Sequence, residues 1–325
     1  MLVRRVSGLL TRSLPLSTRP TRVRVFAPGS IGNVGPGLDI LGLAVTGAGD
    51  TVVAERTPAP GIVIRDPGHP SLPASPARHA SAIAARAVLT RAGGRRRGLA
   101  LTVIKGLPLA GGQGGSAASA VAGAYAANVL LGSPLGPNEL LQAALEAEAL
   151  LAGRHLDNIA PALLGGLVLI RSLDPLEVVR LPVPRRLTLV LAHPDQELET
   201  RRGRAVLPRE VRRGDALHQA AQVAAIVAAS CQGDLALLGR AIDDRIAEPA
   251  RARLLPGFRE AKAAALEAGA FGCSISGSGP TTFAITGSRV TAERVGRAMR
   301  AAYAREGMAC AVRIARPDLE GAREV

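Results

Sequence analysis

The sequence feature that most constrains the fold is a run of small residues, PLAGGQGGSAAS, at positions 108–119. It follows an apolar segment that predicts a strand at residues 98–105, and it leads into an apolar helix of Ala, Gly and Ser. Consecutive glycines let backbone N–H groups converge on one point, beside the positive end of the helix dipole. This order of elements indicates an anion site, most suitably for a phosphate group. A flexible loop before a tightly packed helix is the alternative interpretation.

The loop has neither of the two common nucleotide-binding fingerprints. It lacks the Gly-Lys-Ser/Thr ending of a Walker A loop, and it does not have GxGxxG spacing. Ser116 and Ser119 place hydroxyl groups at the start of the helix, where one of them can reach a metal ion. The sequence therefore predicts phosphate binding by a loop of another kind.

A second candidate residue is Glu148, on a helix predicted at residues 138–152. The apolar residues of this helix share one face with Glu148 in its middle, whereas its other acidic residues lie on the opposite side. A carboxylate among apolar side chains has to be paired, protonated or bound to a metal. A glutamate at the rim of the core, with its head group in water, is the alternative. The segment HLDN at residues 155–158 follows directly and places further polar groups next to Glu148.

The 325 residues are enough for one large domain or two ordinary ones. Strands and helices alternate without βαβ regularity, which favours the α+β class. The segment at residues 174–186 contains three prolines, so we expect a domain boundary there, with one domain at 22–183 and another at 184–325. We expect a glycine-rich turn at 28–42 and a proline-rich loop at 58–76. Further strands are expected at 22–27, 50–56, 166–171, 187–192, 273–276 and 281–285, and further helices at 77–92, 216–231, 234–246 and 258–268. A last helix and a last strand are expected after residue 285.

The formal net charge of +14 does not by itself indicate a partner. Only Lys105 and Lys262 among the 40 basic residues are lysines, and the heavy use of Arg, Ala, Gly and Pro is typical of GC-rich codon bias. The charge is scattered, and two Tyr, four Phe and no Trp offer little base stacking, so we expect no nucleic-acid partner. Three widely spaced cysteines argue against a disulfide framework and a zinc site.

The first 21 residues contain four arginines and no acidic residue. They are typical of a disordered tail or of a mis-assigned start, and a transit peptide is the alternative. Residues 116–132 are the nearest approach to a membrane span, but they are small and too few for a bilayer. We therefore expect a cytoplasmic protein with no membrane partner.

Six segments, taken in order, resemble the GHMP small-molecule kinases, and within them the homoserine kinases. The loop at 108–117 matches the P-x-x-x-G-L-G-S-S-A element, and SISGSGPT at 274–281 matches the G-I-S-G-S-G-P-T element. The other matches are Asn33, Gly37 and Asp39 to N-x-x-x-G-x-D; Glu148 and HLDN to a helix Glu followed by H-x-D-N; Thr200, Arg204 and the Leu-Pro at 207–208 to T-x-x-x-R…L-P; and EPARARLLPGF at 248–258 to E-P-x-R…L-L-P-G-F.

The resemblance implies a two-domain fold and a reaction. An N-terminal α+β domain would hold ATP, a C-terminal domain would be ferredoxin-like, and the substrate would lie in the cleft between them. The implied reaction is the MgATP-dependent phosphorylation of L-homoserine to O-phospho-L-homoserine, in threonine biosynthesis, by a homodimer. Transfer would be direct and in line, without a dedicated base. The alternatives are a GHMP kinase for mevalonate or a sugar, and an inactive ATP-binding protein of this fold.

The resemblance also implies roles for single residues around ATP. Mg²⁺ would be held by Ser116 and Glu148, and the phosphate loop would be supported by Ser276, Gly277 and Gly279. The residues implied to contact ATP are Lys105, Pro108, Gly111, Gly112, Gln113, Gly114, Gly115, Ser116 and Ala117.

Further roles are implied around homoserine. Asn33 and Asp39 would bind its ammonium group. Its carboxylate would be bound by Arg204 and Arg251, with Thr200 and His155 nearby. Asn158 would lie beside the reacting hydroxyl and, with Glu148 and Ser116, form the catalytic set.

The chain departs from the family pattern at three positions and in one linker. Gln113 stands where the family loop has leucine, and the linker before His155 is one residue short. Gly115 stands where the family has the first serine of the loop, so one hydroxyl is missing. A single neutral hydrogen bond contributes roughly 0.5–1.5 kcal/mol, and we expect weaker ATP binding rather than its loss. His79 stands where the family has an asparagine near the adenine.

Overall fold

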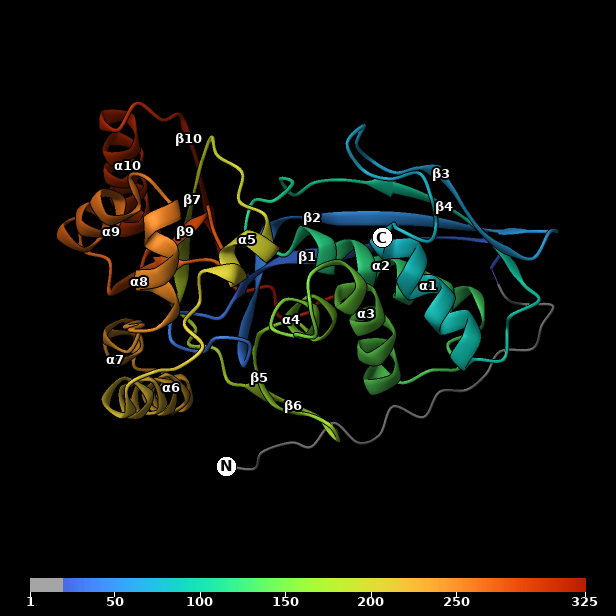
Figure 1. Ribbon diagram of the computed structural model, residues 1–325, viewed down its shortest axis with the longest axis horizontal. Helices are drawn as coiled ribbons and strands as arrows, with labels where there is room; N and C mark the ends of the chain where they lie inside the picture. The colour runs from blue at the N-terminus through green and yellow to red at the C-terminus, as the bar shows by residue number, and fades with distance from the viewer. Residues whose placement is uncertain (1–19) are drawn as a thin grey trace.

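Two β-sheets, one built mainly from each half of the chain, organise the molecule (Figure 1). The computed structural model describes residues 20–325. Most of the segment 1–21, expected to be a tail, therefore lies outside the described residues. Within the described part, no helix combines the length and the apolar character that crossing a membrane requires.

The first sheet has the strand order β11-β1-β2-β4-β3, with β5 pairing to β2 and β6 to β5. The long strand β2 joins the main run of strands to the β5–β6 pair, because one end of β2 pairs with β4 and the other with β5. A register shift between Pro28 and Gly29 is a bulge in the β1–β2 pair, which bends the ribbon. The strands are β1 (Arg22–Gly32), β2 (Leu41–Thr57), β3 (Gly61–Asp66), β4 (Gly98–Ile104), β5 (Leu167–Leu173), β6 (Leu176–Leu181) and β11 (Arg323–Glu324).

One face of the first sheet is covered by α1 (Ala80–Arg91), α2 (Gly115–Leu130) and α4 (Ile159–Leu164), and α3 (Pro137–Leu151) packs against these helices (Figure 1). The helix α2 is buried on nearly all sides, and its small residues make this possible. A Cβ atom at Gly123, for example, would collide with the backbone of Ser81 in α1. The glycine loop is therefore joined to a helix that is held firmly in the core.

The second sheet is antiparallel, with the order β10-β7-β9-β8. Its strands are β7 (Thr188–Pro194), β8 (Gly272–Ile275), β9 (Thr282–Thr286) and β10 (Cys310–Ala315). The order is 4-1-3-2 along the chain, with α9 (Phe258–Glu267) before β8 and α10 (Arg289–Arg305) between β9 and β10, which is a ferredoxin-like arrangement. The expected α+β class with a ferredoxin-like second half is confirmed.

Four helices between β7 and α9 complete the second half: α5 (Thr200–Ala205), α6 (Arg213–Gln232), α7 (Leu235–Arg240) and α8 (Ala247–Arg251), the last continued by a 3₁₀ turn at Ala252–Leu254. Apolar side chains from both sheets share one buried cluster, in which Ile31 and Leu41 of the first sheet pack with Leu189 and Phe283 of the second. This common core fixes the two halves against each other.

Several boundaries differ from the sequence prediction. The first strand runs to Gly32, so the turn is confined to residues 33–40. Three strands were missed: β3 inside the proline-rich loop, β6 inside the predicted boundary and the two-residue β11. Prolines flank β3 and β6 without interrupting them, which concealed these short strands. The helix predicted at 234–246 ends at Arg240. The strand β11 pairs with β1, so the last residues of the segment 184–325 belong to the first sheet.

Candidate active site

A cavity of about 420 Å³ opens where the two halves meet. The glycine loop and the start of α2 form one side, and α3, the segment 155–158, α5 and α8 form the other. The sequence-predicted residues that line it are Asn33, Lys105, Pro108, Gly111, Gly112, Gly114, Gly115, Ser116, Ala117, Glu148, His155, Asn158, Thr200, Arg204, Arg251 and Gly277. The fold thus brings together residues that lie more than 200 positions apart in the sequence.

The turn between β8 and β9 holds the glycine loop in place through hydrogen bonds to its carbonyl groups. Ser276 donates a hydrogen bond from Oγ to the carbonyl of Gly112 at 2.6 Å, and Thr281 donates one to the carbonyl of Gly111 at 2.6 Å. Gly112 has a φ of 71°, and a Cβ there would lie 2.6 Å from the backbone oxygens of both Ser276 and Gly279. These bonds hold the loop backbone in place. The first N–H groups of α2 have no acceptor within the helix, so they are available to a ligand in the cavity.

The side chain of Gln113 does not line the cavity. Its amide nitrogen donates to Thr281 Oγ1 at 3.1 Å, and its oxygen accepts from Arg313 Nη2 of β10 at 2.8 Å. Gln113 therefore fastens the loop to the second sheet. This contact depends on a residue 200 positions away, and no local pattern indicated it.

Lys105 lies at the edge of the cavity in an ion pair with the fully buried Asp50. Its ammonium group also donates to the carbonyl of Gly115 and to Ser119 Oγ, each at 3.2 Å. A Cβ at Gly115 would lie 3.4 Å from this nitrogen, which is ordinary contact. The structure thus places Gly115, one of two departures in the phosphate loop, directly beside its lysine.

His79 is buried at the N-cap of α1 and lines the cavity. Burial lowers the pKa of the ring, so it is neutral. Nε2 lies 3.2 Å from the carbonyl of Pro67, and Nδ1 lies 2.9 Å from Ser81 Oγ. Both ring nitrogens are occupied, and His79 offers a ligand its ring surface.

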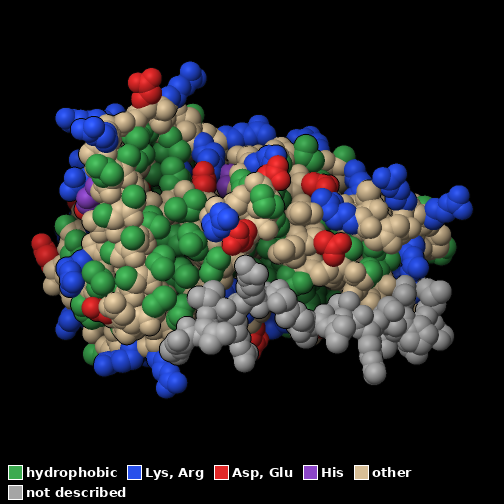
Figure 2. Space-filling view, turned by 90° about the horizontal axis from the view of Figure 1, so that it is seen from below, with side chains coloured by type: hydrophobic (Ala, Val, Ile, Leu, Met, Phe, Trp, Pro, Cys, Tyr) green, Lys and Arg blue, Asp and Glu red, His purple; other side chains and the backbone are tan. Residues whose placement is uncertain are grey.

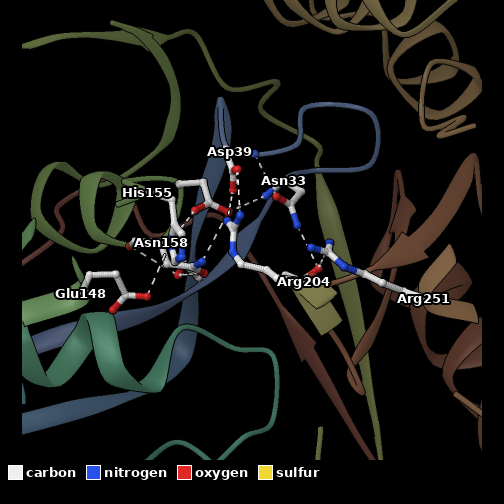
Figure 3. A network of polar contacts seen from close by, with 10 residues as sticks. Asn33, Asp39, Glu148, His155, Asn158, Arg204 and Arg251 are labelled. Atoms are coloured by element: carbon white, nitrogen blue, oxygen red, sulfur yellow. Dashed lines mark hydrogen bonds and ion pairs between the residues drawn. The ribbon is translucent and has the colours of Figure 1, made fainter. Parts of the chain in front are cut away.

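Glu148 and His155 both line the cavity, and their side chains lie next to each other (Figure 3). Glu148 is 6% exposed, its Oε2 has no hydrogen-bond partner within the described chain, and its Oε1 lies 3.6 Å from His155 Nδ1. Burial raises the pKa of Glu148 to about 7, Asp157 adds to the rise, and the Ser116 hydroxyl partly offsets it. A buried carboxylate with a free oxygen, beside a hydroxyl at a helix N-terminus, fits Mg²⁺, which takes one or two carboxylates together with phosphate oxygens.

Asp157 is a site residue that the sequence reasoning missed. It lines the cavity and is buried, and burial raises the pKa of its carboxyl to about 7, with a further contribution from Asp39. Oδ2 accepts from the backbone N–H of Asn33 at 3.1 Å, whereas Oδ1 has no hydrogen-bond partner among the described residues and lies 3.6 Å from His155 Nδ1. The signal was present in the sequence, because Asp157 is the third residue of HLDN, between two residues that were selected.

Arg204 and Asp39 form a two-bond ion pair at the upper end of the cluster (Figure 3). Asp39 does not itself line the cavity, but its partner does. Arg251 is buried, which lowers the pKa of its guanidinium, and it donates to the carbonyls of Gly277 at 2.9 Å and Gly203 at 3.2 Å. Asn33 donates to the same Gly277 carbonyl at 2.9 Å. Two guanidinium groups and the carboxylate of Asp39 therefore lie close together at this end of the cavity.

The raised pKa of Asp157 predicts a pH-dependent effect of Asp157→Asn on stability. In the unfolded chain this carboxyl loses its proton near pH 4, whereas in the ligand-free folded state it holds the proton until about pH 7. The folded wild type therefore binds more protons across this window, and rising pH removes stability that the amide variant keeps.

We expect the melting temperature of Asp157→Asn, relative to wild type, to rise from pH 4 to about pH 7 and then to level off. Taking the difference between the two proteins cancels the titration of His79 and His193, whose lowered pKa values do not depend on Asp157. Thermal unfolding at four pH values measures it. A difference that does not change with pH would contradict the burial of an ionisable Asp157.

Two family models match this chain. The GHMP kinases N terminal domain matches residues 79–166, and the GHMP kinases C terminal domain matches residues 226–305. A homoserine kinase of Chlorobium phaeobacteroides is 44% identical over 294 residues, covering 86% of this chain and 92% of that protein. A homoserine kinase of Arabidopsis thaliana is 43% identical over 293 residues, covering 88% and 79%.

Solved structures give the same result. The crystal structure of homoserine kinase from Cytophaga hutchinsonii has a TM-score of 0.90 and 38% identity, covering 98% of this chain and all of that one. Mevalonate kinase from L. major, at 17% identity and a TM-score of 0.64, shares the fold alone. The chain therefore belongs to the GHMP kinase family and is homologous over most of its length to homoserine kinases.

Proposed function

We propose that this protein phosphorylates the hydroxyl group of L-homoserine with MgATP, giving O-phospho-L-homoserine and MgADP. The observation that carries the proposal is that one cavity joins a phosphate-binding loop to two arginines with carboxylates beside them. The relatives named homoserine kinase, at 40–44% identity, support the same substrate.

The charges in the cavity suit an amino acid that carries a hydroxyl. Homoserine has a carboxylate for Arg204 and Arg251 and an ammonium group for Asp39 and Asn33. Without a ligand, Arg204 and Asp39 neutralise each other, and a zwitterion can replace that pair with one partner for each sign. We place Thr200 and His155 beside the carboxylate end and Asn158 beside the reacting hydroxyl.

The other end of the cavity suits the triphosphate. The N–H groups of the loop and the dipole of α2 face the phosphates, and Lys105 stands at their edge. Ser116 and Glu148 would hold Mg²⁺, which when bound supplies charge neutralisation on the phosphates. Phosphoryl transfer depends on positioning and neutralisation more than on a strong base, so we propose direct in-line attack by the hydroxyl.

The alternatives are another GHMP kinase and an inactive relative. Mevalonate and sugars lack the paired charges of an amino acid, so Asp39 would have no ammonium group to bind. The inactive alternative is motivated by Gly115, which removes one hydroxyl from the phosphate loop. A kinase for another alcohol would turn over that alcohol, whereas an inactive relative would bind ATP without turnover.

A coupled ADP-release assay with MgATP distinguishes these possibilities. L-homoserine, mevalonate, galactose and a reaction without an acceptor form the panel. We expect ADP release that depends on homoserine and is at background level with the other three. Turnover of mevalonate or galactose but not of homoserine would overturn the proposal, and ATP binding without any turnover would favour the inactive relative.

Replacing Arg204 by alanine is expected to separate the two substrates. Hydrogen bonds to charged groups contribute about 1.5–3 kcal/mol, so KM for homoserine should rise by about 10- to 100-fold. KM for ATP should stay within about twofold, because the proposed contact is with the amino acid alone. Steady-state kinetics with each substrate varied in turn measures this. Arg202→Ala, on the exposed side of α5, is the matched control, and equal rises in both KM values would count against the assignment.

We also propose that the protein is a homodimer that pairs through α6. The middle of this helix is rich in Ala, Val and Ile, yet one side of the helix is exposed, with Leu217 at 65% and several alanines around it. Figure 2 shows hydrophobic side chains gathered over the lobe at its left, where α6 lies. Sedimentation velocity at micromolar concentration should give twice the chain mass of 33.3 kDa, and a monomer throughout would contradict the proposal.

A further inference from the structure

We propose that Gln219 of α6 is a positioning residue for the homoserine end of the cavity. It does not line the cavity. Instead it fixes, from behind, the turn that carries Asn33 and Asp39 and the helix that carries Arg251. The substrate named here rests on the proposed function, but the contacts that support the inference do not.

The carboxamide of Gln219 is buried and makes three hydrogen bonds. Nε2 donates to the carbonyl of Pro36 at 3.0 Å and to Asp244 Oδ1 at 3.0 Å, and Oε1 accepts from the backbone N–H of Arg245 at 3.1 Å. Both amide hydrogens are used, and a reversed amide would place its oxygen against two acceptors, so the orientation is determined. One side chain thus connects α6 to two separate segments.

The first of these segments is the turn at residues 33–40. Asn33, Val34 and Asp39 have φ values of 67°, 48° and 63°, a region that residues other than glycine rarely adopt. Such strain persists only where the surroundings over-determine the backbone. The bond from Gln219 to Pro36 lies at the middle of this strained turn, between Asn33 and Asp39.

The second segment is the N-terminus of α8, which Asp244 caps. Its Oδ1 accepts from the N–H groups of Ile246 and Ala247 at 2.8 and 2.9 Å, and its Oδ2 accepts from Glu248 at 2.9 Å. Because α8 has only five residues, this cap determines where the helix begins and therefore where Arg251 stands. Gln219 holds the capping carboxylate and the neighbouring Arg245 N–H at once.

The two segments meet again on the cavity side. The carbonyl of Gly277 accepts from Asn33 Nδ2 and from Arg251 Nη1, each at 2.9 Å. Asn33 and Arg251 are therefore connected through Gly277 on the cavity side, and their segments are connected through Gln219 on the side away from the cavity. Removing the bonds made by Gln219 leaves Asn33 and Arg251 unchanged as residues. It allows the backbone segments that carry these two side chains to move relative to each other.

The test replaces Gln219 by methionine, which has a similar length and removes all three hydrogen bonds. Gln222→Met is the matched control, because Gln222 lies on the same helix, is half-buried and makes no side-chain hydrogen bond within residues 20–325. We expect KM for homoserine to rise about tenfold in Gln219→Met, with KM for ATP within twofold and the control like wild type. A merely structural role would lower the amount of folded enzyme without separating the two KM values, and that result would overturn the inference.

A second measurement does not depend on which substrate is used. Amide hydrogen exchange of the ligand-free variants should be faster in peptides covering residues 33–40 and 244–254 of Gln219→Met, and unchanged in peptides covering the glycine loop. Faster exchange in neither segment, or equally throughout the chain, would overturn the inference. If wild type does not phosphorylate homoserine, the proposed function fails, and the exchange experiment still decides the role of Gln219.

Discussion

Replacing Glu148 by glutamine is expected to lower kcat by about 10²–10³-fold, the size typical of removing one group that stabilises transferring charge. The carboxylate is buried, has a free oxygen facing the cavity and lies beside Ser116. Glutamine keeps the size and removes the charge that would hold Mg²⁺. The apparent Mg²⁺ concentration for half-maximal rate should rise as well, which a magnesium titration of the rate measures.

The same substitution should leave the ligand-free protein as stable as wild type, or more so, at pH 8. Burial raises the pKa of Glu148, so its ionised form disfavours the folded state at that pH, and the amide removes this cost. Glu146→Gln, exposed on the same helix, is the control and should retain full activity. If Glu148→Gln kept wild-type kcat and magnesium dependence, Glu148 would be removed from the site.

The second large effect is expected at Gly112, where alanine should lower kcat/KM for MgATP by about 10²-fold or more. The added Cβ would meet the backbone oxygens of Ser276 and Gly279 at 2.6 Å, and φ is 71° there, which disfavours any L-residue. Neither oxygen belongs to a flexible side chain, so the loop itself has to move. A displacement of about 1 Å in a site that works by positioning is enough for a loss of this size.

The contrasting substitution is Gly115→Ser, three residues along the same loop. Its Cβ would make only ordinary contact with Lys105 Nζ at 3.4 Å, and the new hydroxyl would stand where the family has one. We expect KM for MgATP to fall by about two- to tenfold, the equivalent of one neutral hydrogen bond. Kinetics of both variants with ATP varied measures the contrast. Equal losses at Gly112 and Gly115 would show that the loop geometry does not set activity.

Part of this site follows from local sequence patterns. The glycine loop was predictable because a strand, consecutive glycines and a small-residue helix leave few alternatives, and Glu148 because it interrupts an apolar helix face. The order of motifs supplied Arg204 and Arg251, which in a chain of 38 arginines no local pattern distinguishes. The α+β class followed from the irregular alternation of strands and helices.

The remaining features depend on contacts between distant residues. Gln113 turns away from the cavity because Arg313 and Thr281 meet it from the second sheet. Gln219 is one of several polar residues on α6, and nothing nearby in the sequence marks it as the partner of Pro36 and Asp244. Short strands such as β3 and β6 depend on their neighbours in the sheet rather than on their own residues, which is why proline-rich surroundings concealed them.

The two lysines have a consequence for chemical labelling. Lys105 and Lys262 each form an ion pair with a carboxylate, Asp50 and Glu248 respectively, and their side chains are only 9% and 24% exposed. Protonated, paired amines react slowly with acylating reagents, so the many surface arginines give the protein its positive charge without giving it reactive amines. Apart from the N-terminal amine, an amine-directed reagent would therefore find two side-chain amines: Lys105, which lines the cavity, and Lys262, which is paired with Glu248 of α8. A bound nucleotide would shield Lys105 further, so the extent of labelling at Lys105 with and without nucleotide would measure whether the pocket is occupied.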